Sequence, residues 1–402
     1  MSPPRTFALL CAVAFLAFVS YDLVRRPALA LFAGSLGATP VTVGILVALS
    51  TVTGIFVKLP VGVMSDLLDR RKFMIGGLLA FALPPFFYPV ISDVTILGTL
   101  RLAHGLATAL FTPLALAMVA QLYAERRGEA MGWYTAAAQG GGLLGPMLGG
   151  ILVYAVGFSS TFLMAGAFGT LSLVLFLCMP RTVIPAPRLK RTHRTFMTEV
   201  RQGVKDIVRH RGILTTSLTE ASKMMANGTL MAFLPLYGLS IGLNAAQVGV
   251  LFGIQALTSL FAKPAMGKIS DRTGRHTPIV IGLCLCGAML ILIPQLETLK
   301  YLLIVSAVFG LGEAVITSSS TALIADLSHH TSIGAGMGMR GTIMDIGHAA
   351  GPVIAGILIA SIGYRGGFAV IGIFQFITAG VFGMIMEGNR RRTIPEERPV
   401  SQ

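Results

Sequence analysis

The chain has 402 residues, of which 54% are apolar and only 12% are charged. This charged share is about half that of soluble proteins, so the sequence has too few polar side chains to cover a soluble fold and predicts an integral membrane protein. The net charge of +14 would otherwise favour a nucleic-acid partner. The basic residues lie in short segments between apolar runs, however, which is typical of membrane topology, so no nucleic acid is expected.

Twelve apolar runs, each of roughly 20 residues or more, are long enough to cross a bilayer as helices. In chain order they cover residues 7–32, 41–62, 73–91, 96–120, 131–154, 159–180, 212–240, 246–267, 278–295, 300–323, 335–360 and 366–387. The predicted fold class is therefore all-α and integral to the membrane, with twelve transmembrane helices. The first run could be a signal peptide, but it continues past the cleavage-like site at Ala30 and has a partner in the second half, so we expect a retained span.

The distribution of Lys and Arg predicts the orientation. With the N-terminus in the cytoplasm, the inner segments hold 22 basic residues and the outer loops hold only Lys300 and Arg365. Cytoplasmic loops carry such an excess, so both termini are expected in the cytoplasm and the protein in a plasma membrane, the inner membrane of a bacterium. Lys58 and Lys263, near the inner ends of two runs, are expected to extend to the cytoplasmic surface.

The second half of the chain repeats the first. Residues 43–70 and 248–275 share ten identities in 28 positions, and further glycines recur at offsets of 205 to 206 residues. The basic segment 181–211 separates the copies and is expected to lie against anionic headgroups. We therefore expect two pseudo-symmetric six-helix bundles. The expected divisions are an N-terminal bundle (1–180), a cytoplasmic linker (181–211), a C-terminal bundle (212–388) and a cytoplasmic tail (389–402).

A charged loop follows the second run and returns in the second half. The copies contain Gly62, Asp66, Arg70 and Arg71, and Gly267, Asp271, Arg272, Gly274 and Arg275. Over essentially its whole length, the sequence resembles the major facilitator superfamily, whose loop signature is Gly-x-Leu-Ala-Asp-Arg-x-Gly-Arg-Lys. The first copy of the loop departs from this signature at Asp69, where the family usually has Gly. The resemblance implies a cytoplasmic gate that holds the halves together while the outer side is open. An acid that faces an arginine and a helix N-terminus could form this lock; the alternative is a solvated loop that only fixes topology.

The fifth run contains a more specific glycine pattern. Its members are Gly132, Gly141, Gly145, Pro146, Gly149 and Gly150. Gly141, Gly145 and Gly149 fall on one helix face, where a neighbouring helix can approach backbone to backbone, and Pro146 should kink the helix. The spacing resembles the antiporter motif of drug:proton antiporters, which implies an exporter; ordinary small-residue packing is the alternative. The eleventh run keeps only part of the pattern.

Charged side chains within the runs are the candidate cavity and proton-coupling residues, because each is costly in lipid unless it faces a partner or a cavity. They are Asp22, Arg25, Arg26, Arg101, His104, Glu220, Lys223, Glu313 and Asp345. Arg101-x-x-His104-Gly105 resembles the Arg-x-x-Gln-Gly motif of the family, which implies that Arg101 lies beside the central cavity and takes part in proton movement. His104 and His348 are expected to be hydrogen-bonded packing residues.

Asp22 is the leading candidate for proton coupling. Arg25 and Arg26 stand at i+3 and i+4, so local pairing is available on a continuous helix. The resemblance also places Arg101 across the cavity from Asp22. We therefore expect Asp22 and Arg101 to form a switchable ion pair.

The remaining carboxyl groups have different surroundings in the sequence. Glu220 and Lys223 lie one turn apart and could neutralise each other, and Asp345 could pair with Arg340. Glu313 has no basic neighbour on its helix and lies about 20 Å into a helix entered from the outer side, so it is a candidate auxiliary proton site.

The sequence offers no phosphate-binding loop, metal-ligand cluster or nucleophile triad, so we expect neither enzyme activity nor a cofactor or metal. Energy would then come from an ion gradient. We interpret the chain as a monomeric transporter that exports a small molecule in exchange for protons by alternating access. Alternatives are an organic-anion transporter of the same superfamily, indicated by Arg25, Arg26, Arg101 and Lys223, and a membrane sensor that does not transport. Intact loop motifs in both halves argue against the sensor, which needs no gate.

Overall fold

The computed structural model describes residues 3–64, 70–123, 126–180, 211–327 and 333–393, and every regular element within them is helical. In the first half these are α1 (Pro3–Leu23), η1 (Val24–Ala28), α2 (Leu29–Ser35), α3 (Pro40–Met64), α4 (Arg70–Ala82), α5 (Pro84–Phe87), η2 (Tyr88–Val90), α6 (Val94–Leu122) and α7 (Arg127–Leu177). In the second half they are α9 (Arg211–Ser240), α10 (Ala245–Thr273), α11 (His276–Leu292), η4 (Ile293–Gln295), α12 (Leu299–Leu327) and α13 (Ile333–Thr393). The expected linker, 181–211, lies almost wholly outside the described residues.

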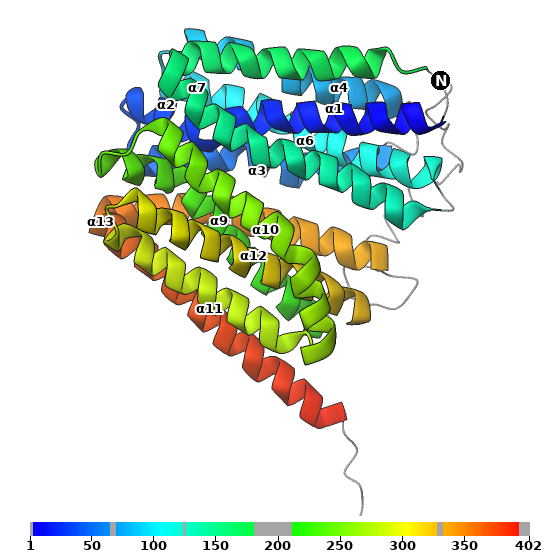
Figure 1. Ribbon diagram of the computed structural model, residues 1–402, viewed down its shortest axis with the longest axis vertical. Coiled ribbons are helices and arrows are strands. Elements are labelled where there is room, and N and C mark those ends of the chain that lie inside the picture. The colour runs from blue at the N-terminus through cyan, green and yellow to red at the C-terminus, as the bar shows by residue number, and fades with distance from the viewer. Residues whose placement is uncertain (1–2, 65–69, 124–125, 181–210, 328–332, 394–402) are drawn as a thin grey trace, which may run out of the picture.

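The described helices provide the twelve predicted crossings. Nine helical segments among the described residues are long and apolar enough to cross a membrane. Two of them, α7 and α13, each contain two crossings, and the chain reverses its direction between them at Gly157 and at Gly363 (Figure 1). The φ angles there are 79° and 72°, which glycine adopts without a steric penalty. Helix α9, which carries the polar residues of the seventh run, completes the set.

The first crossing is interrupted near its middle. Helix α1 ends at Leu23, a wider turn follows, and α2 continues the crossing from Leu29. Arg26 has φ −143° and ψ 126°, because the ring of Pro27 disfavours helical geometry in the preceding residue. The interruption therefore lies at the two arginines of this crossing.

Glycine contacts repeat between the halves. A Cβ built on Gly105 would lie 2.5 Å from the Ser50 carbonyl oxygen, and one built on Gly310 would lie 2.2 Å from the Gln255 carbonyl oxygen. Gly310 stands 205 residues after Gly105, and Gln255 stands 205 residues after Ser50. The duplication in the sequence is therefore also a duplication of helix packing.

The glycine face of the fifth crossing packs against the first crossing. A Cβ on Gly141 or Gly149 would lie 2.3 or 2.5 Å from a carbonyl oxygen of α1, and a Cβ on Gly145 would lie 2.8 Å from Asp22 Cβ. No side chain fits in these gaps. The close backbone approach expected from the glycine spacing is thus present, and it fixes the position of Asp22.

The two halves touch most closely at one end of the bundle, which we name the turn side. It carries the turns at Gly37, Gly157, Gly242 and Gly363. A Cβ on Gly150 would lie 2.4 Å from the Ala245 carbonyl oxygen, and one on Gly356 would lie 2.6 Å from the Pro40 carbonyl oxygen. Both contacts join one half to the other, and the repeat relates them.

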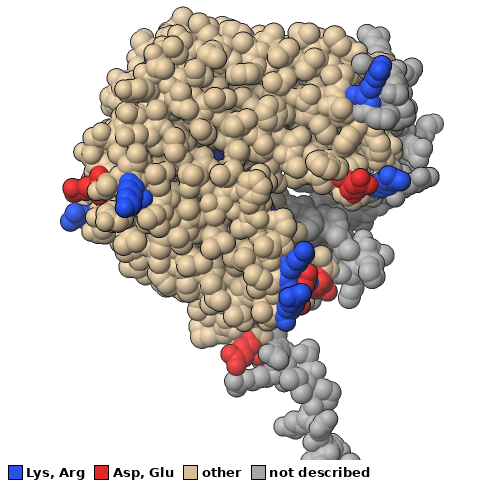
Figure 2. Space-filling model, in the orientation of Figure 1, with Lys and Arg blue, Asp and Glu red and all other residues tan. Residues whose placement is uncertain are grey.

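The opposite end, where α1 begins and α3 ends, is the N-terminus side. The ribbons of the two halves diverge towards it (Figure 1). Figure 2 shows a hollow between the halves at this end. The interface is therefore closed at the turn side and opens towards the N-terminus side.

Substitution of Gly145 by alanine should destabilise the protein. The added Cβ would meet α1 backbone and Cβ atoms within 3.0 Å, so the helices must move apart, at a cost of about 1–3 kcal/mol. We expect Gly145→Ala to lower the temperature of unfolding in detergent.

Gly132 provides the matched control on the same crossing. A Cβ there would meet nothing within 4 Å, and alanine favours a helix by about 1 kcal/mol over glycine. Gly132→Ala should therefore keep or slightly raise the temperature of unfolding. Equal unfolding temperatures for the two variants would show that the face of Gly145 is not tightly packed.

Candidate functional site

Arg101 is fully buried on α6 and has only neutral partners. Its guanidinium donates to Ser50 Oγ at 2.5 Å and to Tyr88 Oη at 3.5 Å, and His104 Nδ1 lies 3.1 Å from the same Tyr88 Oη. No ion pair joins Arg101 to Asp22 within the described part of the chain. The predicted ion pair between Asp22 and Arg101 is therefore absent from this structure, because Arg101 donates to Ser50 of α3 and Tyr88 of η2 instead.

Asp22 is a buried carboxylate without a partner. It is 8% exposed, and among the described residues it forms neither a hydrogen bond nor an ion pair. The expected local pairs with Arg25 and Arg26 are absent because the helix widens at Val24 and is interrupted at Arg26, which removes the i+3 and i+4 geometry. Its Oδ2 lies against α7, 3.3 Å from the position of a Cβ on Gly142.

The two arginines of the first crossing differ in their surroundings. Arg25 donates to His348 Nε2 at 2.5 Å and to Thr51 Oγ1 at 3.4 Å, and its guanidinium lies 5.5 Å from the centroid of the Tyr21 ring. His348 belongs to α13, so this hydrogen bond joins the two halves. Arg26 has no hydrogen-bond partner among the described residues, although its Nε is buried.

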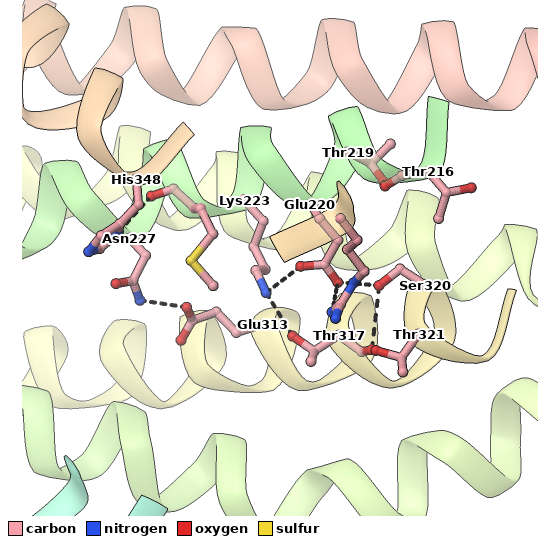
Figure 3. Close-up of polar contacts among 12 residues, drawn as sticks. Thr216, Thr219, Glu220, Lys223, Asn227, Glu313, Thr317, Ser320, Thr321 and His348 are labelled. Atoms are coloured by element: carbon pink, nitrogen blue, oxygen red, sulfur yellow. Dashed lines mark hydrogen bonds and ion pairs between the residues drawn. The ribbon is translucent and has the colours of Figure 1, made fainter. Parts of the chain in front are cut away.

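A buried ion-pair network lies in the second half, between α9 and α12 (Figure 3). Lys223 Nζ lies 2.8 Å from Glu220 Oε2, and Arg340 Nη2 lies 3.0 Å from Glu220 Oε1. Ser320 also donates to Glu220, and Lys223 donates to Thr317 Oγ1 at 2.8 Å. The expected neutralisation of Glu220 by Lys223 is confirmed.

Glu313 of α12 is held by two neutral amides. Asn227 Nδ2 donates to Oε1 at 2.6 Å, and Gln255 Nε2 donates to Oε2 at 3.0 Å. Among the described residues no cation pairs with Glu313, which is 9% exposed. Asn227 stands 205 residues after Asp22, so the halves present an amide and a carboxylate at equivalent positions.

Two lysine contacts join the halves towards the N-terminus side. Lys58 Nζ lies 2.5 Å from Asp345 Oδ2, and Lys263 Nζ donates to Gln139 Oε1 at 3.1 Å. Lys58 and Lys263 occupy equivalent positions in the two halves, and so do their acceptors Asp345 and Gln139. The same contact is therefore an ion pair at Lys58 and a hydrogen bond to a neutral amide at Lys263. The lysines are partly exposed, and beyond the expected extension towards the surface each also bonds to the other half. The pairing of Asp345 with Arg340 is wrong, because Lys58 reaches Asp345 from the other half.

The contacts of the gate residues with other described residues lie within their own halves. Arg70 donates to the Gln121 side chain of α6 at 2.7 Å. Arg71 donates to the backbone carbonyl of Leu177 in α7 at 3.1 Å. Arg275 pairs with Asp271 and, at 3.1 Å, with a carboxylate at the end of α12. These hydrogen bonds raise the pKa of Arg275, so its guanidinium stays charged. The prediction of a lock depends most on Asp66, which lies outside the described residues.

Sequence reasoning missed several partners in these networks. They are Ser50, Gln139, Asn227 and Gln255. All are uncharged, so a search for charges within apolar runs passes over them. The repeat offers the one signal that could have found some of them, since Gln139 and Asn227 are the counterparts of Asp345 and Asp22.

The structure has two duplicated halves, and the interface between them is open at one end and lined with charges. These features are typical of a protein that exposes a central site to one side of a membrane at a time. The family model of the Major Facilitator Superfamily matches residues 10–244 and 216–402. The chain belongs to the Major Facilitator Superfamily. It is accordingly a multi-pass membrane protein and a secondary transporter rather than an enzyme.

Similar proteins extend over nearly the whole chain. An uncharacterised MFS-type transporter of Methanocaldococcus jannaschii is 25% identical over 379 residues, which cover 92% of this chain and 94% of that protein. Multidrug resistance protein MdtG of Salmonella arizonae is 25% identical over 346 residues, covering 83% and 82%. The structure of an inward-facing, unoccupied bacterial homologue of the human lysosomal transporter Spinster aligns with a TM-score of 0.83 at 13% identity, over 98% of this chain and 99% of that one.

The contact between Lys58 and Asp345 can be tested by exchanging its charges. Lys58→Asp alone places two carboxylates opposite each other, so the halves should separate further at the N-terminus side, and Asp345→Lys alone should do the same with two ammonium groups. The double variant restores an ion pair and should restore the original separation. Spin labels on the ends of α3 and α13 would report the distance by pulsed electron paramagnetic resonance.

The equivalent contact provides the control for this experiment. Lys263→Met removes only a hydrogen bond to the neutral Gln139, so its effect on the separation should be smaller than that of Lys58→Asp. If the exchanged pair behaves like either single variant, the attraction between the two charges does not hold the halves together.

Proposed function

We propose that this transporter exports a small molecule in exchange for protons, and that Asp22 carries the exchanged proton. The observation that supports this most directly is the buried Asp22 carboxylate, which has no partner in the described structure. A charged carboxylate without a partner is costly inside a membrane protein, and a proton removes that charge. Because Arg101 is bound to neutral groups, Asp22 is not held by a permanent counter-ion.

The direction of transport is part of the proposal. The relatives named MdtG are multidrug resistance proteins, and the glycine spacing of the fifth crossing resembles the antiporter motif. We place the N-terminus side in the cytoplasm, where the excess of Lys and Arg would lie, with both termini there and the protein in a bacterial inner membrane. The structure then represents an inward-facing state.

The proposed cycle follows from the interface. To face outwards, the glycine contacts of the turn side must separate while the N-terminus sides of the halves approach. The charged loops that follow α3 and α10 would then meet and lock the cytoplasmic side. One chain supplies both halves of the interface, so we propose that the monomer is the transporting unit.

Asp22→Asn should uncouple transport from the pH gradient without abolishing substrate binding, because asparagine keeps the shape of the side chain but cannot exchange a proton. Substrates would first be found with everted vesicles and a chemically diverse panel of compounds. Proton release on addition of those substrates would then be measured with purified protein in detergent. Release by the Asp22→Asn protein equal to that of the unmodified protein would assign coupling to another residue.

Glu313→Gln should have a milder effect and shift the pH optimum of transport. One of the two amides that bind Glu313 can still donate to the remaining oxygen of the glutamine, and the other can rotate so that its own oxygen accepts from the glutamine NH2 group, so the local structure should persist. Asp93→Asn is the matched control: Asp93 caps the N-terminus of α6 on the turn side, and asparagine is an equally good cap. An unchanged pH optimum in Glu313→Gln would exclude Glu313 as an auxiliary proton site.

A further inference from the structure

Two opposite charges near the middle of the first crossing lack partners. Asp22 is 8% exposed with a buried, unbonded Oδ1, and Arg26 has a buried, unbonded Nε. Neither residue forms a hydrogen bond or ion pair with any described residue, and they do not pair with each other. Buried charges are normally paired, so both groups are available to a ligand.

The two charges form no direct bond because the helix between them is interrupted. On a continuous helix, residues at i and i+4 are neighbours and an Asp and an Arg would form an ion pair. Here Arg26 has extended backbone angles ahead of Pro27, and α7 packs its glycine face against Asp22. The interruption of the helix therefore leaves both charges unpaired where a regular helix would have joined them.

The other charges around Asp22 are already bound. Arg25, Arg26 and Arg101 are the cations that act electrostatically on it, while α7 presents glycines. Arg25 is directed to His348 across the interface, and Arg101 is bound to neutral groups of its own half. Arg26 is thus the guanidinium near Asp22 that remains free.

The groups around Arg26 also leave it free. Its guanidinium interacts electrostatically with three residues of the first crossing, Asp22, Arg25 and Tyr21, and with Glu313 of the second half. Glu313 already accepts hydrogen bonds from two amides. The turn η1 that carries Arg26 contacts α9 and α10 of the second half, so Arg26 lies at the interface between the halves, where a transported molecule must pass.

We propose that the substrate is a zwitterion, whose protonated amine binds Asp22 and whose carboxylate or other acidic group binds Arg26. One such molecule satisfies both unpaired charges with charge-assisted hydrogen bonds, and the planar guanidinium of Arg26 is suited to a carboxylate. A ligand with a single charge would leave one of the two residues buried and unpaired.

This inference rests on the proposed proton exchange at Asp22 and agrees with its direction. When the amine of the substrate approaches a protonated Asp22, an N–H···O hydrogen bond forms to the carboxylate, and the proton of the Asp22 O–H group leaves to solvent. Binding therefore releases one proton, as antiport requires. A purely anionic ligand at Arg26 would instead withdraw positive charge from Asp22 and favour proton uptake.

Matched compounds can separate the contributions of the two charges. Phenylalanine, phenethylamine and 3-phenylpropionate share a ring and differ in charge, as do tyrosine, tyramine and 3-(4-hydroxyphenyl)propionate, and tryptophan, tryptamine and indole-3-propionate. Binding to the purified full-length protein would be measured by calorimetry, together with proton release. In at least one set the zwitterion should bind about tenfold more tightly than either singly charged compound.

The variants give the sharper prediction. Arg26→Gln should reduce zwitterion affinity to that of the amine and leave amine binding unchanged, while Arg26→Lys should retain part of the affinity. Asp22→Asn should reduce zwitterion affinity to that of the acid and abolish proton release. Arg365→Gln, which alters a basic residue bound to a backbone carbonyl on the turn side, is the control and should change nothing.

The outcomes distinguish this inference from the proposed function. If amines bind as tightly as zwitterions and Arg26→Gln changes neither, the substrate is a cation and the zwitterion is ruled out, while proton release on binding still supports antiport. If acids bind most tightly and protons are taken up, both proposals fail. Absence of binding by all of the compounds would overturn the zwitterion as well.

Discussion

The close contact of helix backbones at the turn side is the constraint on which the rest of the structure depends. Gly150 and Gly356 bring the two halves so near that a Cβ on either would collide with a carbonyl oxygen of the other half. With the halves fixed at this end, polar contacts between them can form only where the interface still allows side chains to meet. Among the described residues these are the bond from Arg25 to His348 and the two lysine contacts towards the N-terminus side.

The polar contacts within and between the halves differ in strength. Glu220 and Lys223 are 0% and 2% exposed, and breaking a buried pair of this kind costs about 3–5 kcal/mol. The side chains of Lys58 and Asp345 are 40% and 22% exposed, and exposed pairs contribute only about 0.2–1 kcal/mol. The second half is therefore stabilised internally by a strong ion pair, while the lysine contact that joins the halves is weak enough to break in every cycle, as alternating access requires.

The sequence was sufficient for features that depend on local chain geometry. Apolar run length predicted the twelve crossings, glycine spacing predicted the face that meets α1, and the one-turn separation of Glu220 and Lys223 predicted their ion pair. It failed where partners are distant: Asp345 and Lys58 are 287 residues apart, and their contact depends on how the halves are rotated against each other. It also failed at Asp22, because the wider turn and the extended Arg26 change the geometry on which i+4 pairing relies.

The duplicated positions show how a symmetric frame can carry an asymmetric function. Asp22 in the first half corresponds to Asn227 in the second, and Asp345 corresponds to Gln139. Gln139 accepts a hydrogen bond from Lys263 as Asp345 does from Lys58, whereas Asn227 donates to Glu313 and Asp22 has no bond among the described residues. Neither amide can exchange a proton. Each pair thus retains one carboxyl group, and both of these lie on the crossings that Arg25 and His348 connect. A change of charge at either carboxyl group would therefore act next to the contact between the halves.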